Sequence, residues 1–169
     1  MWWLKGAALA AALLSAACGF KPLYGTDGAP AAELAAIVVD PIPDRLGQQL
    51  RTHLEILLDP RGAGAPERYR LNIRLDVESD DVAIRRDETA TRRDLSMAAT
   101  YVLTDLSDGS VATRGRATTV NSYNVVASDV ATRAGERDSL EAGVRRLAED
   151  IKLRLAIFMD RRQSSAGTS

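Results

Sequence analysis

The sequence predicts an α+β domain in which two helices pack on one face of a four-stranded, mostly antiparallel sheet. The order of the predicted elements is strand, helix, three strands and a second helix. Apolar and charged residues alternate over residues 69–78, which predicts a strand with one buried and one solvated face. Leucines recur every three or four residues over residues 46–57, which predicts a helix with one apolar stripe.

The first half of the domain is predicted from an apolar run and a leucine stripe. Residues 34–39 are apolar and are followed by two prolines, which is typical of a short buried strand. Asp44 is expected to cap a helix at residues 45–58. The loop at residues 59–67 is rich in glycine and proline. The helix stripe consists of Leu46, Leu50, Leu54 and Leu57.

The second half is predicted as three strands and a long helix. The strand at residues 69–78 is followed by strands at residues 95–106 and 111–120. Ser-Asp-Gly at residues 107–109 is typical of a tight turn between antiparallel strands. A helix is expected over residues 128–160. Its apolar stripe consists of Leu140, Val144, Leu147, Ile151, Leu155 and Phe158.

Composition and charge exclude several classes of protein. The 169 residues are 46% hydrophobic and 27% charged, which is typical of a globular chain with a sizeable core. With 22 basic and 23 acidic side chains, the net charge of −1 argues against nucleic acid as a partner. One cysteine and one histidine cannot supply the four ligands of a structural zinc site, and we expect neither a metal nor a cofactor.

The N-terminus has the pattern of an export signal that ends at a cysteine. Lys5 precedes an apolar run and three small residues, and Ser-Ala-Ala-Cys resembles the bacterial lipoprotein signal, in which Cys18 is acylated and becomes the first residue. A buried N-terminal helix and a buried free thiol are the alternatives. We therefore predict a lipoprotein signal peptide, a lipidated N-terminus with a tether, an α+β domain and a disordered tail, over residues 1–17, 18–33, 34–162 and 163–169.

The sequence does not predict an enzyme. His53 is the only histidine and lies beside the leucine stripe of the first helix, with no identifiable nucleophile or orienting partner. The acidic pairs at residues 80–81 and 87–88 could bind a hard cation or act as acid–base pairs. Acidic residues beside turns are normally only solvated, and this is the interpretation we adopt.

Arginines gather at two places in the predicted fold. Guanidinium groups hold phosphate through two parallel hydrogen bonds, so such clusters can bind phosphorylated ligands. A solvated face is the alternative, and high-GC codon usage would account for nineteen arginines against three lysines. The clusters are Arg85, Arg86, Arg92 and Arg93 around the turn between the second and third strands, and Arg133 and Arg137 near the start of the second helix.

The residues from Cys18 to Gly25 read Cys-Gly-Phe-Lys-Pro-Leu-Tyr-Gly. This motif closely resembles the start of the mature lipopolysaccharide (LPS)-assembly lipoproteins of the LptE family, in their alphaproteobacterial form. The order of the elements downstream is similar to that family as well, so the resemblance spans most of the chain. Gly19, rather than aspartate, follows the cysteine, and this resembles lipoproteins that are forwarded to the outer membrane.

The resemblance implies a location, two partners and a set of site residues. Acyl chains such as palmitate on Cys18 would anchor the chain in the Gram-negative outer membrane, with the domain facing the periplasm. The domain would fill the lumen of the LptD β-barrel and bind LPS. The basic residues that match the family's LPS-binding positions are Arg86 in the hairpin, with Arg85 as the alternative, and Arg133 at the start of the second helix.

Two other classes of function remain open at the level of sequence. The chain could be the auxiliary lipoprotein of an ABC-type lipid transport system, which shares a small α+β architecture. It could also be a lipoprotein hydrolase, although the missing nucleophile and base argue against this. A stable complex with a large β-barrel would fit only the LPS-assembly role.

Overall fold

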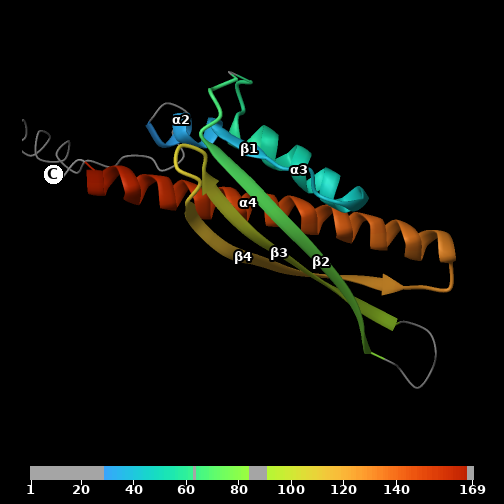
Figure 1. Ribbon diagram of the computed structural model, residues 1–169. Coiled ribbons are helices and arrows are strands. Elements are labelled where there is room, and N and C mark those ends of the chain that lie inside the picture. Colours follow the sequence, from blue (N-terminus) through green and yellow to red (C-terminus); the bar gives the residue numbers. More distant parts are fainter. Residues whose placement is uncertain (1–28, 63, 84–90, 167–169) are drawn as a thin grey trace, which may run out of the picture.

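The computed structural model describes residues 29–62, 64–83 and 91–166, and these form one sheet with helices against it (Figure 1). The four strands are arranged in the order β1-β2-β3-β4, with β1 parallel to β2 and the other pairs antiparallel. The predicted α+β class and the mostly antiparallel sheet are therefore confirmed. In chain order the elements are α2 (Ala29–Ala35), β1 (Ile37–Val39), α3 (Asp44–Leu58), β2 (Tyr69–Ala83), β3 (Thr91–Asp105), β4 (Val111–Val125) and α4 (Asp129–Ala166).

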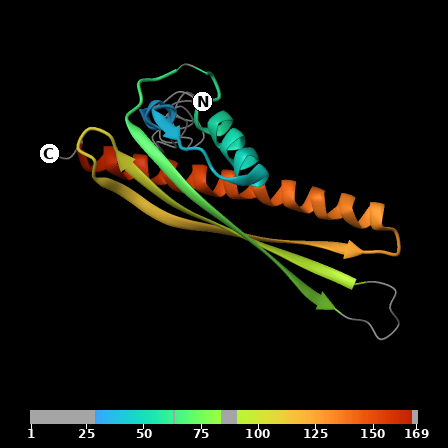
Figure 2. The same cartoon turned by 45° about the vertical axis from the view of Figure 1, so that its right-hand side comes forward.

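Both long helices lie on the same face of the sheet. α4 runs along the sheet, and α3 lies beside α4 at the end that carries β1 (Figures 1 and 2). The alternation in β2 explains this arrangement, since Leu71 and Ile73 are buried while Arg70 and Arg74 on the opposite face are exposed. The opposite face of the sheet is polar, as an antiparallel sheet permits.

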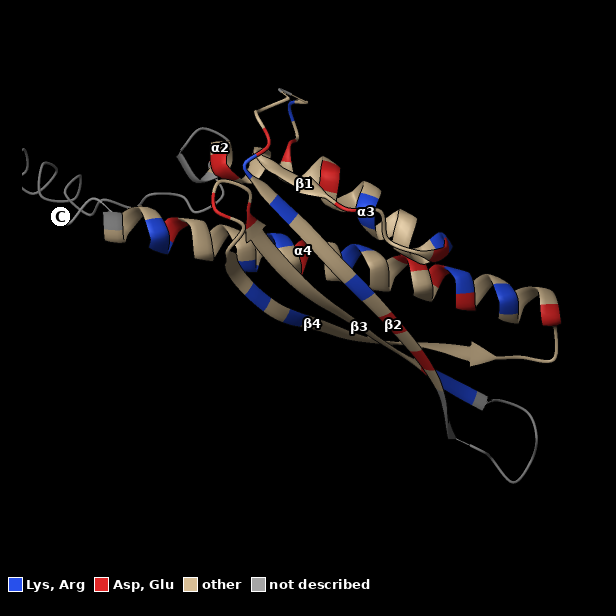
Figure 3. Cartoon of the chain, in the orientation of Figure 1, with Lys and Arg blue, Asp and Glu red and all other residues tan. Residues whose placement is uncertain are grey.

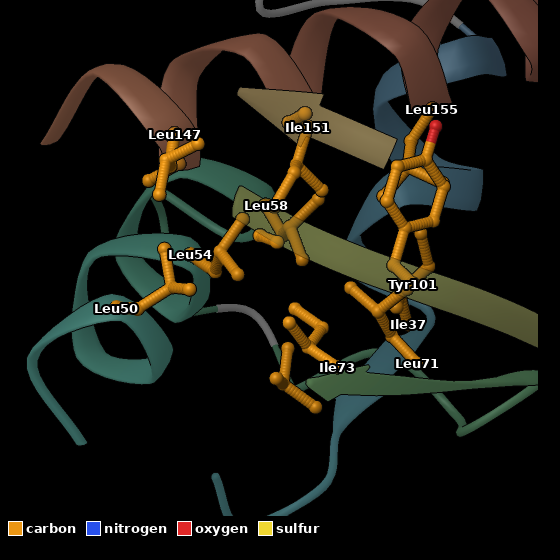
Figure 4. Packing of buried hydrophobic residues seen from close by; sticks show 14 of the residues in the cluster. Ile37, Leu50, Leu54, Leu58, Leu71, Ile73, Tyr101, Leu147, Ile151 and Leu155 are labelled. Atoms are coloured by element: carbon orange, nitrogen blue, oxygen red, sulfur yellow. The ribbon is translucent and has the colours of Figure 1, made fainter. Parts of the chain in front are cut away.

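The core forms where the leucine stripes of the two helices meet the sheet. Leu50 and Leu54 of α3 and Ile151 of α4 are fully buried. The close-up in Figure 4 shows these side chains together with Leu71 and Ile73 of β2 and Tyr101 of β3. The stripes predicted from the 3.6-residue period are therefore the faces that pack, although Leu46, Leu57, Leu140 and Phe158 at their margins are only partly buried.

Several predicted boundaries are wrong. Residues predicted as a tether and the beginning of a strand instead form α2, which contacts α4, and β1 has only three residues. α3 begins at Asp44 itself, so this residue lies in the first turn rather than at the cap. α4 continues to Ala166, so the predicted disordered tail is helical over its first four residues, and residues 167–169 lie outside the described part.

A glycine lets α4 approach the sheet closely. A Cβ atom on Gly143 would clash with Sδ of Met97 and would lie 2.7 Å from Nδ2 of Asn121. Both neighbours are buried, and Asn121 is held by a 2.8 Å hydrogen bond that Arg146 donates to its Oδ1. Gly135 lies on the same helix, closer to its start. A Cβ atom added there would have only Tyr123 Cβ nearby, at an ordinary contact distance of 3.7 Å.

Gly143→Ala should therefore destabilise the domain, and Gly135→Ala should not. Alanine forms helix better than glycine by about 1 kcal/mol, and this gain should appear undiminished at position 135. At position 143 the overpacking should outweigh it, for a net loss of about 1–2 kcal/mol. Urea unfolding of the two single variants measures the difference. A Gly143→Ala variant as stable as Gly135→Ala would show that the helix is not held this close to the sheet.

Candidate functional site

Three of the four predicted site residues lie outside the described residues: Cys18, Arg85 and Arg86. The described strand ends that flank the two arginines, Ala83 and Thr91, lie at one end of the sheet. Thr91 pairs with Val125, which is four residues before the start of α4. The fold therefore brings the two ends of the β2–β3 hairpin and the start of α4 to the same end of the molecule.

Arg133 lies in the second turn of α4 and is exposed. The start of this helix is tied to the end of β4 through Thr132, whose Oγ1 accepts a hydrogen bond from Val126 N at 3.1 Å and lies 3.2 Å from Val126 O. Ser128 Oγ accepts a further hydrogen bond, 3.4 Å long, from the backbone N–H of Ala131. These contacts fix the first turns of α4 and with them the position of Arg133.

Arg133 borders a groove between α3 and α4. The groove has two hollows, of about 320 Å³ and 530 Å³, which share Arg45, Gln49 and Glu141 in their walls. Leu46 and Leu140, one from each helix, line the smaller hollow with apolar surface. The combination of apolar walls and converging polar groups is typical of small-molecule sites, which usually occupy about 300–1,000 Å³.

The border of the groove is charged. Besides Arg133, the smaller hollow is lined by Arg45, Glu136 and Arg137, and the larger one by Arg145. Both signs of charge are visible along the first turns of α4 in Figure 3. Four arginines against two glutamates leave the groove with an excess of positive charge, which favours an anionic ligand.

Unlike most other arginines of the domain, the arginines around the groove have no carboxylate partner in the described part of the chain. Elsewhere Arg51, Arg74 and Arg154 form ion pairs with carboxylates at 2.8–3.3 Å. Within residues 29–62, 64–83 and 91–166, no carboxylate lies within 4 Å of the guanidinium groups of Arg45, Arg133, Arg137 and Arg145.

The arginine cluster predicted at the hairpin is partly engaged within the sheet. Arg92 donates a 2.9 Å hydrogen bond to Ser122 Oγ and lies 3.7 Å from Asp94 Oδ1. Ser122 Oγ in turn donates to the same carboxylate at 2.6 Å. Arg92 therefore stabilises the pairing of β3 with β4 and is a weaker candidate for ligand binding than Arg133.

Sequence reasoning missed the groove, and with it Arg45 and Gln49. The Oε1 atom of Gln49 is buried and has no hydrogen-bond partner in the structure. A buried acceptor without a donor is unfavourable, but this atom has almost no exposed surface, so it does not by itself mark a ligand position. The leucine stripes predicted the apolar residues, but the pairing of α3 with α4 that creates the groove is a tertiary feature.

A second polar cluster, at the opposite end of α4, has a structural role. Asp105 is only 2% exposed and accepts hydrogen bonds from Ser107 Oγ at 2.6 Å and from Arg162 Nη2 at 3.3 Å. The hydrogen bonds from Ser107, and to a smaller extent Arg162, hold the pKa of this carboxyl below its usual range. Arg162 also donates to Tyr69 OH at 3.4 Å. The cluster fastens the last turns of α4 to the sheet.

Neither a candidate metal site nor a membrane-spanning helix is found in the described part of the chain. It holds no group of three or more histidine, cysteine, aspartate or glutamate side chains arranged to bind a metal ion. None of its helices combines the length and apolar character that crossing a membrane requires.

The fold is similar to that of two bacterial proteins of known structure. A protein from Caulobacter crescentus CB15, described as a candidate lipoprotein, superimposes with a TM-score of 0.64 and 26% identity, over 80% of this chain and 98% of its own. A minor lipoprotein from Acinetobacter baumannii superimposes with a TM-score of 0.51 and 17% identity, over 72% of this chain and 91% of its own. Neither a protein-family model nor a curated protein sequence matches the chain. The domain therefore has a fold that is found in bacterial lipoproteins.

Proposed function

We propose that this chain is an outer-membrane lipoprotein that binds LPS and plugs the LptD β-barrel during transport of LPS to the cell surface. The observation that carries the proposal is the motif from Cys18 to Gly25, which resembles the LptE family, in front of a domain with a lipoprotein fold. The lipidation signal, the motif from Cys18 to Gly25 and this fold occur together in one chain, and this combination favours the LPS-assembly role.

In this proposal the lipid anchor attaches the protein to the membrane, and the domain binds LPS and fills the barrel. Two or more acyl chains on Cys18 hold a protein stably on a membrane, because each buried methylene contributes about 0.8 kcal/mol. The domain then lies in the periplasm and within the LptD lumen. In this role the chain has no catalytic residue and needs no cofactor, since passing a lipid onward requires binding and release without bond cleavage.

The site residues of this proposal are Arg86, with Arg85 as the alternative, and Arg133. LPS carries phosphates, and a guanidinium binds phosphate through charged hydrogen bonds. Arg133 is exposed, lies beside the groove and has no carboxylate partner in the described part of the chain. The fold also supports joint action, since the hairpin ends and the start of α4 share one end of the molecule.

Reversing these charges should weaken LPS binding without unfolding the domain. A charged hydrogen bond contributes about 1.5–3 kcal/mol, so Arg86→Glu/Arg133→Glu should lower the affinity for LPS by tenfold or more. Arg133 is exposed, and substitutions of exposed residues usually change stability by about 0.5 kcal/mol or less, so we expect the double variant to keep its melting temperature. LPS binding and thermal melts of the double variant measure both quantities.

The matched control is Arg161→Glu, an exposed arginine on the same helix but at its other end. Its LPS affinity should equal that of the wild type. If the folded double variant binds LPS as tightly as the Arg161→Glu control, these arginines are only solvated. High salt should also weaken wild-type binding, because exposed ionic contacts are screened.

A further inference from the structure

We propose that α2 is a strap that docks on the domain and detaches from it, and that it thereby sets how far the domain reaches from the acylated Cys18. This inference goes beyond LPS binding and barrel plugging, and it rests on the lipid anchor of the function proposed above. Three features carry it, namely the hinge at the end of α2, the small number of contacts that hold α2, and a polar cluster around Tyr69 that fastens it.

The strap has a fixed hinge at Ala36. The backbone oxygen of Ala36 accepts hydrogen bonds from the N–H groups of Arg68 at 2.9 Å and of Tyr69 at 3.1 Å. The next residue, Ile37, is buried and pairs with β2. The chain is therefore fastened to the sheet from Ala36 onward, and α2 can leave without unpairing a strand.

Few contacts hold α2 in place. It has only seven residues, which is too short for a helix that is stable by itself, so α2 is helical only while it is docked. Among residues 31–35, Leu34 alone is buried, and it packs into the core where α2 lies against α4 (Figure 1). An element with so little buried apolar surface opens locally far more often than the whole domain unfolds.

A polar cluster around Tyr69 fastens the strap. Arg68 Nη1 donates a 2.7 Å hydrogen bond to Glu33 Oε1, and the Arg68 guanidinium lies 5.2 Å from the centre of the Tyr69 ring. Burial, and after it the hydrogen bond to Glu33, raises the pKa of the Tyr69 hydroxyl. Arg162, in the last turns of α4, donates to the same hydroxyl at 3.4 Å. The cluster therefore joins the strap to β2 and to the end of α4, and Glu33 is the strap's contribution to it.

Detaching the strap lengthens the link between the anchor and the domain. Seven residues span about 10 Å as an α-helix and up to about 25 Å as an extended chain. The domain can therefore move roughly 15 Å further from Cys18, while the sheet and both long helices stay intact. This gain suits a domain that has to reach from its membrane anchor into the lumen of a barrel.

The first test measures hydrogen exchange in the full mature lipoprotein, held in vesicles of phosphatidylethanolamine and phosphatidylglycerol. The N–H of Ala36 donates to Ala32 O at 3.2 Å and reports on α2, whereas the amides around the fully buried Ile151 report on the core. The Ala36 amide should exchange at least a hundredfold faster than those around Ile151, because the strap opens locally. Exchange at Ala36 as slow as that around Ile151 would overturn the strap.

Glu33→Arg should detach the strap, because it places a further positive charge beside Arg68 and removes the acceptor of its hydrogen bond. Exchange at Ala36 should become at least tenfold faster, and exchange around Ile151 should stay unchanged. The matched control is Glu55→Arg, since Glu55 forms an ion pair of the same kind on α3, 2.8 Å from Arg51 Nε. This control should leave the exchange at Ala36 at the wild-type rate.

A charge swap separates the ion pair from a merely local disturbance of α2. Glu33→Arg/Arg68→Glu restores opposite charges, so the exchange at Ala36 should be slower than in Glu33→Arg alone. No recovery in the swapped variant would contradict the fastening by this pair. Wild-type exchange at Ala36 in Glu33→Arg, or equal acceleration in Glu55→Arg, would also show that the Tyr69 cluster does not hold the strap.

The second test measures how far the domain stands from the membrane. Cys18 is the only cysteine of the chain, so Thr118→Cys on the exposed face of β4 gives the acylated protein a single site for a fluorescent label. Quenchers attached to the lipid headgroups should quench this label at least twofold less in Glu33→Arg than in the wild type or in Glu55→Arg, because the longer link lets the domain move away. Equal quenching in a Glu33→Arg variant whose α2 exchanges faster would overturn the strap as the control of reach.

Failure of this inference differs from failure of the proposed function. If palmitate labels Cys18 and the LptD barrel is recovered while α2 exchanges as slowly as the core, the proposed function stands and the strap is wrong. If Cys18 carries no acyl chain, the label is not quenched in the wild type either, and the anchor of the proposed function fails together with the reach proposed here.

Discussion

Ile151→Ala should lower the free energy of unfolding by about 2–5 kcal/mol, because it deletes a fully buried side chain and leaves a cavity. Ile151 is 0% exposed and lies where α4 meets α3 and the sheet (Figure 4). Leu147→Ala should have a similar effect, since Leu147 is 1% exposed on the same stripe. Urea unfolding of the mature protein measures both losses.

Ile56→Ala is the matched control for this prediction. Ile56 also lies on a helix, α3, but is 60% exposed, so the same change there removes little buried surface and should alter stability by about 0.5 kcal/mol or less. Losses below half a kilocalorie at both Leu147 and Ile151 would contradict the packing described here and would indicate that the stripe of α4 faces a partner instead.

Cys18→Ala should abolish lipid attachment, so the protein should lose its acyl anchor in the outer membrane. Without the thiol there is no atom to acylate, so the variant should remain uncleaved or become soluble, and labelling with radioactive palmitate should be lost. Trp2 and Trp3 both precede the expected cleavage site, so the mature wild-type protein should show tyrosine fluorescence only. Equal labelling of the wild type and Cys18→Ala would contradict the anchor, and a tryptophan emission band from mature protein would contradict the cleavage site.

The elements with one buried face could be predicted closely from the sequence. In β3 the predicted face of Leu95, Met97, Ala99, Tyr101 and Leu103 is buried throughout, because alternation records which residues meet the core. β4 is longer than predicted, ending at Val125 rather than at residue 120. The added residues are mostly polar, and their pairing with β3, from Leu95↔Asn121 to Thr91↔Val125, holds them in the strand.

The helical segments at the two ends of the described domain, α2 and the last turns of α4, were predicted less well, because their order depends on contacts with residues far away in the sequence. α2 is short and rich in alanine, with a proline at its second position, and the same composition is typical of a linker. Its contact with α4 compensates for the cost of ordering it. At the other end, α4 continues past Arg162, whose bonds to Asp105 and Tyr69 join residues far apart in sequence.

Only part of the candidate site could be predicted from the sequence. Arg133 could be identified from a short resemblance at the start of the second helix, and the structure places it beside a groove. Arg45 and Gln49 carry no local signal, because each is an ordinary polar residue on the flank of a leucine stripe. Their significance depends on which helix lies opposite, and only the packing of α3 against α4 reveals it.

Affinity purification from outer-membrane extract, followed by mass spectrometry, tests the central proposal most directly. The tagged full-length lipoprotein should recover a large β-barrel of the LptD type in stable complex, and Arg161→Glu should recover it equally well. Recovery of the subunits of an ABC-type lipid transporter in place of the barrel would contradict the LPS-assembly role and would assign the chain to the transport system that remained open as the alternative.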